Sequence, residues 1–532
     1  MIIEGTLTMP EINNSTNDLN KTSILQWLEN SAKSFPNKPA FTDAFSSITF
    51  SELENKAKAA AAVICKYSLP QTPVAFYLEK STAAVCGMMG TVYAGCFYSF
   101  VDVRQPETRA KTVLQTLNPS LIITDEENYD KLLAFSDIKC IKLEELFSQD
   151  TDNRQAAEQT EEILLQRRNN SLDIDPLYVN FTSGSTGTPK GVTVSHRCVI
   201  DFIPVFCEQF SLTHEDSFCN QAPFDFDVSV KDIYSGLYLG ATVHLIPREY
   251  FSAPLKLMDF ICEKKPTVLV WAVSALCFVS IMKGLDYKVP DSIKTIMFSG
   301  EVMPVKQLHV WQKFLPSVRF INVYGPTEIT CNCTFHILNK EYSDNENIPI
   351  GKPFKNEKVF LLDEDNKLIS APNLPGELCV SGTSVALGYY NNKERTDEAF
   401  VQNPLNPYYN ETIYRTGDLA KYDDEGNLLY IGRKDFQIKH MGHRIELGEI
   451  ETVTMSLENI TRACSIYDFE KKRIVLFYTG ELEKSELTKQ LRLKLPPFMI
   501  PSSIKQIEQM PLNKNGKIDR KALTSIYENG GN

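Results

Sequence analysis

The chain has 532 residues, too long for one hydrophobic core and equivalent to roughly three or four units of ordinary domain size. Hydrophobic residues make up 43% of it, and its formal charge of −12 argues against a nucleic-acid groove, which would need a basic stripe. The longest nearly uncharged apolar run, Val268 to Met282, falls short of the about 20 residues that span a bilayer. We therefore expect no nucleic-acid partner and no membrane insertion, and interpret this run as a buried strand leading into a buried helix.

The cysteines and the N-terminal stretch indicate the compartment. The stretch from Met1 to Asn20 is polar and lacks the basic-then-apolar order of a secretory signal. Thirteen cysteines, an odd number, fit reduced core residues better than a disulfide framework. Only Cys331 and Cys333 lie close together, and the seven histidines form no metal-like cluster. We expect a cytoplasmic protein.

Strand-like and helix-like segments alternate in the first part of the chain. The predicted strands are Val74 to Leu78, Phe97 to Val101 and Leu121 to Thr124, and the predicted helices between them are Thr82 to Ala94 and Pro106 to Leu117. Such alternation is typical of parallel sheets covered by helices. After a polar segment from Gln149 to Asn170, interpreted as a surface helix and loop, it resumes to about Thr334.

The remainder has a different pattern. Between Ile348 and Tyr430 the strands shorten and turns multiply, which predicts a small β-rich subdomain. The final segment, about one hundred residues long, is mixed in pattern and has the size of a small α+β domain.

The stretch from Asn180 to Val192 has the composition of a polyphosphate cradle. Glycines let the backbone approach a bulky anion, and amides, hydroxyls and a lysine supply donors and charge. The hydroxyls are those of Thr182, Ser183, Ser185, Thr186 and Thr188; the glycines are Gly184, Gly187 and Gly191; the lysine is Lys190. Pro189 precedes the lysine and strand-like residues follow, so the loop joins two strands instead of opening a helix. A disordered linker is the alternative, which the apolar runs on both sides disfavour.

A second polar turn, Asn322 to Glu328, follows a strand-like run, and strand ends are where open α/β sheets bind ligands. Tyr324 can stack on a base, Thr327 can meet phosphate, and Glu328 can hold Mg²⁺, which prefers carboxylate oxygens beside nucleotide phosphates. Asp418 offers one carboxylate at a turn, suited to ribose hydroxyls. Near the end of the chain, Asn515-Gly516-Lys517 has the composition of a turn, and by itself its lysine could be that of any turn.

Taken in order, these segments resemble the adenylate-forming superfamily over nearly the whole chain, and most closely nonribosomal-peptide-type amino acid adenylation domains and D-alanine carrier-protein ligases. The matched segments are Tyr93 to Gly95, Asn180 to Val192, Asn322 to Glu328, Gly376 to Leu378, Tyr414 to Asp418, Gly432 to Glu451, Leu495 to Pro501 and Pro511 to Leu523. The resemblance implies an α/β fold: a large N-terminal core of two α/β subdomains plus a β-rich one, residues 1–434, and a small mobile α+β C-terminal domain, residues 435–532. Asp435 is implied as the hinge.

The resemblance also implies an activity. ATP would convert an amino acid to an aminoacyl-AMP with release of pyrophosphate, and the aminoacyl group would pass to the phosphopantetheine thiol of a separate acyl or peptidyl carrier protein. ATP and Mg²⁺ are the implied cofactors, with Glu328 as metal ligand. The implied catalytic residues are Lys517, Lys190 and Glu328.

The resemblance assigns binding residues position by position. The implied ATP-binding residues are Thr182, Ser183, Gly184, Ser185, Thr186, Gly187, Lys190, Gly300, Glu301, Asn322, Val323, Tyr324, Gly325, Pro326, Thr327, Asp418, Tyr430, Arg433 and Lys517. The implied substrate-binding residues are Asp227, Val228, Lys231, Ala275, Met297, Ser299, Val323, Cys331, Asn332 and Lys517. Departures from the usual pattern occur at His440, Met441 and Phe498, in parts tied to the second half-reaction.

Asp227 bears on the substrate, because it matches the family's position for an α-ammonium. Fatty-acid and aryl activators usually lack this aspartate, so it favours an amino acid over the alternative, an acyl- or aryl-CoA synthetase. Lys231 could meet an acidic side chain, although a lysine on a strand more often reaches solvent. A third hypothesis, a non-catalytic nucleotide-binding protein, is disfavoured by four intact residues: Lys190, Glu328, Asp418 and Lys517.

Overall fold

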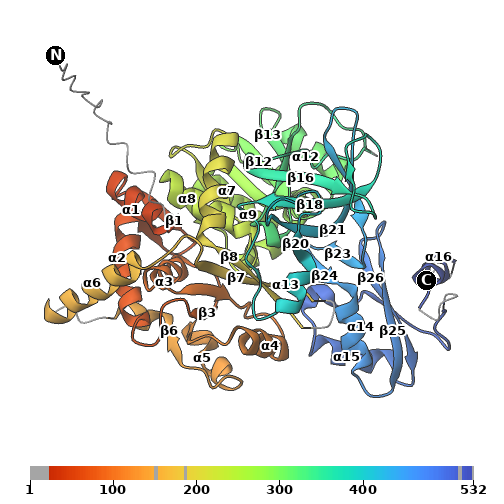
Figure 1. The fold of residues 1–532 in the computed structure, drawn as a ribbon, viewed down its shortest axis with the longest axis horizontal. Helices are drawn as coiled ribbons and strands as arrows, with labels where there is room; N and C mark the ends of the chain where they lie inside the picture. The colour runs from red at the N-terminus through yellow and green to blue at the C-terminus, as the bar shows by residue number, and fades with distance from the viewer. Residues whose placement is uncertain (1–22, 149–153, 185–187, 345, 513–517, 530–532) are drawn as a thin grey trace, which may run out of the picture.

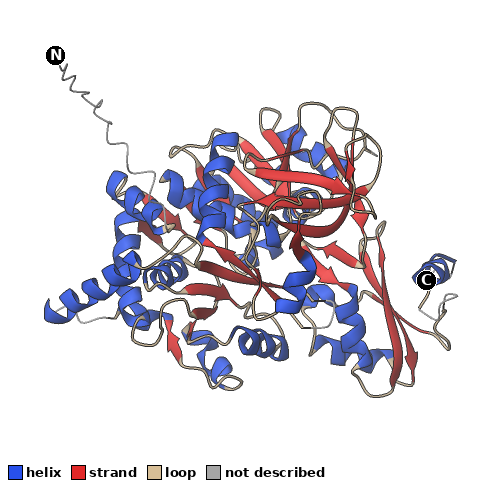
Figure 2. Cartoon of the chain, in the orientation of Figure 1, coloured by secondary structure: helices blue, strands red, loops and turns tan. Residues whose placement is uncertain are grey.

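The structure is a computed structural model, and it describes residues 23–148, 154–184, 188–344, 346–512 and 518–529. Figure 1 shows a large body that carries most of the chain and a smaller C-terminal unit beside it, drawn in blue. Figure 2 shows sheets with helices packed between and around them in the large body. The described residues form five sheets, of which three belong to the large body.

The first sheet has seven strands in the order β19-β8-β7-β4-β3-β5-β6. The central pairs β3·β4 and β3·β5 are parallel, and these strands are buried along their length, as expected for a sheet covered on both faces. β7 and β8 pair antiparallel, with Thr182 opposite Lys190, so the predicted phosphate loop does join two strands. The strands are β3 (Pro73–Tyr77), β4 (Phe97–Phe100), β5 (Leu121–Thr124), β6 (Cys140–Lys142), β7 (Pro176–Thr182), β8 (Lys190–Ser195) and β19 (Gly388–Tyr389).

The second sheet has nine strands in the order β15-β14-β13-β12-β11-β9-β10-β1-β2. The run from β13 to β1 is parallel, and antiparallel strands close both edges. The strands are β1 (Pro39–Thr42), β2 (Ser47–Thr49), β9 (Ser217–Asn220), β10 (Thr242–Leu245), β11 (Val268–Ala272), β12 (Thr295–Ser299), β13 (Arg319–Tyr324), β14 (Thr334–Ile337) and β15 (Lys352–Pro353).

One apolar cluster joins the two sheets. It contains Val74 and Phe76 of the first sheet, Val270 and Met297 of the second, and buried residues of the helices between them, such as Tyr234. The helices and helical turns of the large body are α1 (Leu25–Ser34), α2 (Phe50–Ile64), α3 (Thr82–Tyr93), α4 (Glu107–Leu117), α5 (Glu126–Leu133), η2 (Leu143–Phe147), α6 (Arg154–Asn169), α7 (His196–Gln209), α8 (Val228–Leu239), η3 (Arg248–Ser252), α9 (Pro254–Lys264), α10 (Val273–Ile281), α11 (Gly284–Tyr287), α12 (Val305–Phe314), η4 (Thr327–Ile329) and α13 (Lys393–Ala399).

The third sheet is the predicted β-rich part. Its strands pair antiparallel in the order β17-β16-β18-β21-β20, with β22 on β21. They are β16 (Glu357–Leu362), β17 (Leu368–Ile369), β18 (Gly376–Gly382), β20 (Phe400–Gln402), β21 (Thr412–Tyr422) and β22 (Leu428–Arg433).

The C-terminal unit consists of a two-stranded hairpin and a three-stranded sheet with helices on both faces. Helices α14 and α15 pack with the hairpin on one face, where Ile450, Leu476 and Leu491 are buried. α16 packs on the opposite face, where Phe477 and Leu523 are buried. The elements are β23 (Gln437–His440), β24 (His443–Glu446), α14 (Leu447–Met455), β25 (Ile460–Asp468), β26 (Arg473–Gly480), α15 (Lys484–Arg492), η5 (Pro497–Met499), β27 (Ser503–Gln506) and α16 (Arg520–Asn529).

Most predicted elements are confirmed within one or two residues, and Val268 to Met282 is indeed a buried strand, β11, followed by α10. One prediction is wrong: Lys231 lies in α8 and is buried, whereas the sequence suggested a strand residue that reaches solvent. The helix from Val228 to Leu239 is buried nearly all round, polar residues included, so its sequence lacks the amphipathic stripe that would have separated a helix from a strand.

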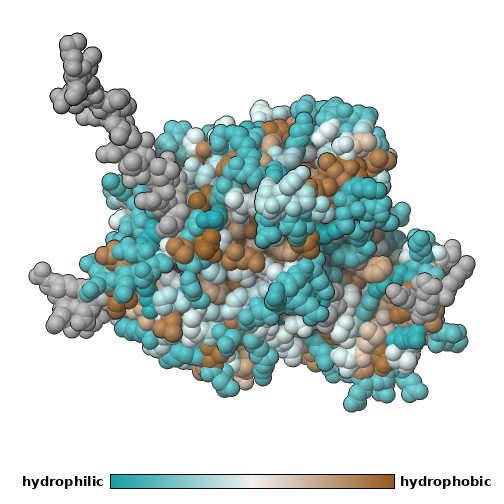
Figure 3. All heavy atoms as spheres, viewed as in Figure 1, coloured by the Kyte–Doolittle hydropathy of each residue, from teal (hydrophilic) through white to brown (hydrophobic). Residues whose placement is uncertain are grey.

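On the face drawn in Figure 3, hydrophobic residues form scattered patches within a largely hydrophilic surface. None of the helices in the described residues combines the length and apolar character needed to cross a bilayer. All thirteen cysteines are free thiols.

Candidate active site

The phosphate loop lies between β7 and β8, and its described residues already form a tight turn. A side chain at Gly184 would place a Cβ 2.0 Å from the Thr188 carbonyl oxygen, so only glycine fits there. The Thr182 hydroxyl is buried and has no hydrogen-bond partner among the described residues. Lys190 is buried, and burial lowers the pKa of its ammonium to about 8. The predicted ATP-binding residues Ser185, Thr186 and Gly187 lie outside the described residues.

Glu328 lies directly across from Lys190, in the turn η4 after β13. It is 0% exposed, and its carboxylate is 3.5 Å from the Lys190 Nζ. The Tyr389 hydroxyl donates a hydrogen bond to it at 2.7 Å, and the Arg444 guanidinium pairs with it at 2.6 Å. Burial alone would raise the pKa of this carboxyl, but the charges of Arg444 and Lys190 hold it well below its usual range.

Two strands of the β-rich sheet bring the predicted ribose residues together. Arg433 on β22 pairs with Asp418 on β21 at 2.9 Å, and the Tyr324 hydroxyl donates a hydrogen bond to the same carboxylate. The Tyr430 ring lies 6.3 Å from the Tyr324 ring. Arg433 and Tyr324 thus converge on the Asp418 carboxylate, and Tyr430 lies beside Tyr324.

Gly300 and Glu301 were predicted to lie beside the adenine base, and the structure places the two residues in different surroundings. Gly300 has φ +92° and faces open space, as a residue beside a planar group would. Glu301, however, accepts a hydrogen bond from the Gly442 amide of the C-terminal hairpin. Gly325 packs directly on the neighbouring turn, since a Cβ there would lie 2.5 Å from the Asn332 Cα.

The predicted substrate pocket gathers at the start of α8. Asp227 precedes the first residue of the helix and is buried, which raises the pKa of its carboxyl, while a hydrogen bond from the Thr327 side chain and the charge of Lys231 oppose the shift. The Cys331 thiol donates to the Asp227 carbonyl oxygen at 3.1 Å. Lys231 donates to the Asn332 Oδ1 at 2.6 Å.

The pocket walls follow the register of the second sheet. Met297 and Val323 share an apolar cluster with Cys331 and with α8, because strand alternation turns them to the same face. Val228 and Ser299 are buried as well. Ala275 packs instead in a second cluster on the other face, with Trp271 and Leu276, so the structure does not bring it together with the α8 residues.

Several residues of the site were not predicted to be there, and most come from the C-terminal hairpin β23–β24. Ser183 donates to the Arg444 carbonyl oxygen at 2.7 Å, and the Lys439 Nζ lies 5.4 Å above the Tyr324 ring. Arg444 and Tyr389 contact Glu328. The many charged residues between Gly432 and Glu451 indicated a functional segment. The local sequence did not indicate that Arg444 would pair with the Glu328 carboxylate.

The predicted hinge, Asp435, is clamped in this structure. Arg433 forms a two-pronged ion pair with it, Nε to Oδ1 and Nη2 to Oδ2, both at 2.7 Å. The same guanidinium also holds Asp418. The backbone just before the hairpin is therefore tied to the ribose corner of the site.

Lys517, the predicted catalytic lysine, lies outside the described residues. The residues on either side, Leu512 and Ile518, form a β-bridge, and the helix that follows, α16, packs on the face of the C-terminal sheet opposite the hairpin. Figure 1 shows α16 on the side of this unit away from the large body.

The residues present fit a nucleoside triphosphate with Mg²⁺. The unpartnered Thr182 hydroxyl and the glycine turn suit phosphate oxygens. The Glu328 carboxylate stays ionised and supplies the oxygen ligand that Mg²⁺ prefers. In the part of the chain that the structure describes, no group of three or more His, Cys, Asp or Glu is arranged to hold a metal.

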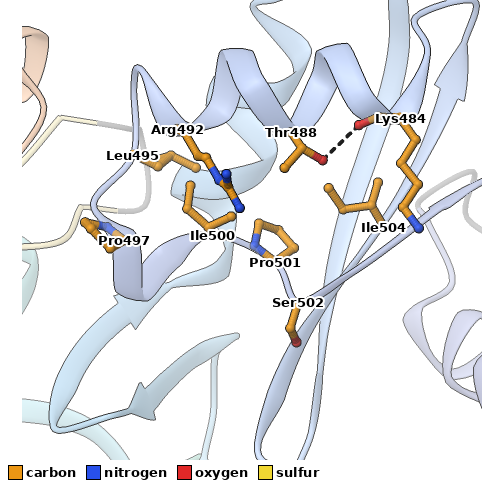
Figure 4. Close-up of a pocket in the computed structure, with 9 residues that line it drawn as sticks. All are labelled: Lys484, Thr488, Arg492, Leu495, Pro497, Ile500, Pro501, Ser502 and Ile504. Carbon is orange, nitrogen blue, oxygen red and sulfur yellow. Dashed lines mark hydrogen bonds between the residues drawn. The ribbon is translucent and has the colours of Figure 1, made fainter. Parts of the chain in front are cut away.

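A cavity of about 710 Å³ lies apart from this site, in the C-terminal unit (Figure 4). Its walls come from α15 and from the segment between Leu495 and β27, and Lys484 and Arg492 are among them. Because every lining residue belongs to the C-terminal unit, the cavity is separate from the nucleotide site.

The chain is similar to known proteins over nearly its whole length. A family model described as "AMP-binding enzyme" matches residues 28–390. Zwittermicin A synthase ZmaJ from Bacillus cereus is 31% identical over 517 residues, covering 95% of this chain and 95% of that protein. Tyrocidine synthase 2 from Brevibacillus parabrevis is 32% identical over 509 residues; these are 94% of this chain, which spans only 13% of that protein's length.

One solved structure illustrates the fold. The Vibrio cholerae adenylation domain AlmE, in complex with glycyl-adenosine-5'-phosphate, matches with a TM-score of 0.80 and 22% identity, covering 98% of this chain and 99% of that one. The likeness confirms the predicted fold class, an α/β body followed by a small α+β unit.

Proposed function

Because this chain belongs to the family of AMP-binding enzymes, we propose that it activates an amino acid. ATP converts the amino acid to an aminoacyl-AMP with release of pyrophosphate, and the aminoacyl group then passes to the phosphopantetheine thiol of a separate carrier protein. The thirteen free cysteines support a reducing, cytoplasmic setting.

The observation that carries the proposal is the position of Asp227 beside the nucleotide site. The Thr327 side chain forms a hydrogen bond with Asp227. Glu328, the residue that follows Thr327 in the chain, faces Lys190 of the phosphate loop. A buried carboxylate is suited to an α-ammonium, and the α-carboxylate of such a ligand would then lie next to the phosphates. An acyl or aryl acid has no positive group for Asp227 to bind.

The chemistry demands positioning and charge compensation. A carboxylate oxygen of the amino acid attacks the α-phosphorus, a new C–O–P link forms, the bond to the β-phosphate breaks, and pyrophosphate leaves. Lys190 places positive charge where the leaving group develops negative charge, and the buried site strengthens that interaction. Asp418 and Tyr324 orient the nucleoside. Mg²⁺, held by Glu328, supplies further charge neutralisation when bound. The role proposed for Lys517, which lies outside the described residues, is to bridge the substrate carboxylate and the α-phosphate.

The arrangement of the C-terminal unit suits the second half-reaction. The hairpin β23–β24 occupies the nucleotide site, and its Arg444 pairs with the carboxylate proposed to hold the metal. The residues that flank Lys517 lie on the opposite side of the unit. Rotation about Asp435 of a C-terminal domain, residues 435–532, against the core, residues 1–434, would exchange the hairpin for Lys517.

The test is pyrophosphate–ATP exchange across a panel of L- and D-amino acids, followed by loading of phosphopantetheinylated carrier proteins. Exchange that depends on an amino acid supports the proposal. Exchange only with acids that lack an amino group, together with formation of a CoA thioester, would replace it by an acyl- or aryl-CoA synthetase.

A further inference from the structure

We propose that the amino acid activated by this chain has a side chain that ends in a carboxylate, and that Lys231 and Asn332 bind this group. The inference rests on the proposed function, because it names the substrate class of the same pocket.

The starting point is a buried ammonium. Lys231 is 0% exposed, in the first turns of α8, and an ammonium removed from water is costly unless it is paired. Among the described residues its hydrogen-bond partner is the neutral Asn332 amide, at 2.6 Å. An ammonium has three N–H donors, so this single bond leaves donors to be satisfied.

Two acidic groups attract Lys231, and each has a hydrogen bond to another residue. Asp227 lies one helical turn before Lys231, hydrogen-bonds with Thr327 and is the residue proposed to bind the α-ammonium. Asp232 accepts a hydrogen bond from Asn220 at its Oδ2, at 2.9 Å, and Lys80, which donates to the same Asn220, attracts it. Its buried Oδ1 has no hydrogen-bond partner among the described residues. Both carboxylates attract Lys231 from a distance, but within the described residues neither forms an ion pair with it inside 4.0 Å.

Asn332 adds donors to the same spot. Because an ammonium cannot accept a hydrogen bond, the contact with Lys231 assigns the Asn332 carbonyl oxygen to that side and leaves its NH₂ group to donate elsewhere. Asn332 is 1% exposed, and its backbone is held by the left-handed residues Thr330 and Cys331 and by the close approach of Gly325. The donors are therefore fixed in place before a ligand arrives.

A carboxylate is the side-chain group that matches this arrangement. Its two oxygens accept from Lys231 and Asn332, and its charge compensates the ammonium. A side-chain amide would bring its own N–H groups against donors, an apolar side chain would leave the ammonium unpaired, and a basic one would be repelled. Asp227 and Lys231, four residues apart on one helix, thus match the ammonium and the carboxylate of one ligand.

The experiment is pyrophosphate exchange with the wild-type chain and with aspartate, glutamate, asparagine, glutamine, alanine, valine and lysine, each as L and D forms. We expect one of the acids to exceed its own amide by about 100-fold or more in kcat/KM, the scale associated with a buried charge pair. A best substrate with a neutral or basic side chain overturns the inference while leaving amino acid activation intact. No exchange with any amino acid overturns both.

Variants separate the role of Lys231 from a general effect. Lys231→Met keeps the length without the charge and should collapse the acid-over-amide ratio by about 100-fold. Lys367→Met, at an exposed turn of the β-rich sheet, is the matched control and should leave the ratio unchanged. If Lys231→Met does not fold, Asn332→Asp provides the test, because its carboxylate would occupy Lys231 and repel an acidic ligand. An unchanged ratio in whichever variant folds overturns the inference.

Discussion

At the scale of single residues, Asp227 links the pocket to the class of substrate. It is 8% exposed, lies at the start of α8, and its pKa is raised by burial in the absence of a cationic partner within ion-pair distance among the described residues. A ligand ammonium would restore the charge balance there.

We expect Asp227→Ala to weaken activation of the preferred amino acid by about 10²–10³-fold, because the ligand's ammonium would lose its buried partner, a loss of about 3–5 kcal/mol. The des-amino analogue of equal size should be affected little, since it brings no charge. Exchange rates for both ligands with both proteins isolate the coupling. Equal weakening of the two ligands would make Asp227 a structural carboxylate and favour a CoA ligase.

At the scale of elements, the hairpin β23–β24 is the segment that joins the C-terminal unit to the site. The His443 ring stacks on Phe498 with centroids 3.6 Å apart and planes 2° apart, and Phe226 of the large body lies 6.0 Å away. Two of the positions that depart from the family pattern make side-chain contacts within the C-terminal unit: Phe498 stacks on His443, and His440 hydrogen-bonds with Tyr467 at 3.0 Å.

The docked hairpin should be less stable in acid. Burial lowers the pKa of His443 to about 4 from 6.5, with Arg248, His440 and Arg109 also lowering it and Asp102 opposing them. Between these two pH values the imidazole of His443 binds a proton in the undocked or unfolded chain and not in the docked chain. The stabilisation that the neutral, docked His443 ring provides is therefore fully present above about pH 6.5 and is lost as the pH falls toward 4. His443→Phe keeps the stacking and removes the proton. Thermal unfolding midpoints from pH 7 to 4.5 should therefore shift in favour of the variant as the pH falls, and parallel curves would contradict the assignment.

The hinge prediction also belongs to this scale. We expect Asp435→Pro to slow carrier loading more than pyrophosphate exchange, since a φ locked near −65° restricts a rotation that only the complete cycle needs. Because proline also removes the carboxylate that Arg433 clamps, Asp435→Asn is the control: it loses the ion pair and keeps backbone freedom. Equal loss of both half-reactions in the proline variant, measured separately, would argue against a hinge at this residue.

At the scale of the whole molecule, an ion pair beside the phosphate loop ties the C-terminal unit to the large body. Arg109 of α4 pairs with Glu449 of α14, which is 1% exposed on its side chain, and the Gly184 amide donates to the other oxygen of Glu449 at 3.3 Å. The phosphate loop and the C-terminal unit thus share one buried carboxylate.

Arg109→Gln should destabilise the docked arrangement, because it leaves the Glu449 carboxylate buried without its cation. We expect carrier loading to fall by roughly tenfold or more while pyrophosphate exchange changes less. Arg104→Gln is the matched control, since Arg104 and its partner Glu79 are both exposed and such pairs contribute little. A uniform fall in both reactions would show that Arg109 supports the fold and not the docked state.

The sequence by itself determined the order of strands and helices, the loop between β7 and β8, the β-rich part and the superfamily resemblance, because each depends on residue types a few positions apart. The site residues remain predictions, and the structure shows what surrounds them. Only the tertiary structure decided that Lys231 lies buried in a helix against Asn332, 101 positions away, and that Arg444 meets Glu328 across 116 positions. Contacts over such separations depend on how whole units pack. A local pattern of charge or hydrophobicity therefore does not predict which distant carboxylate a guanidinium will contact.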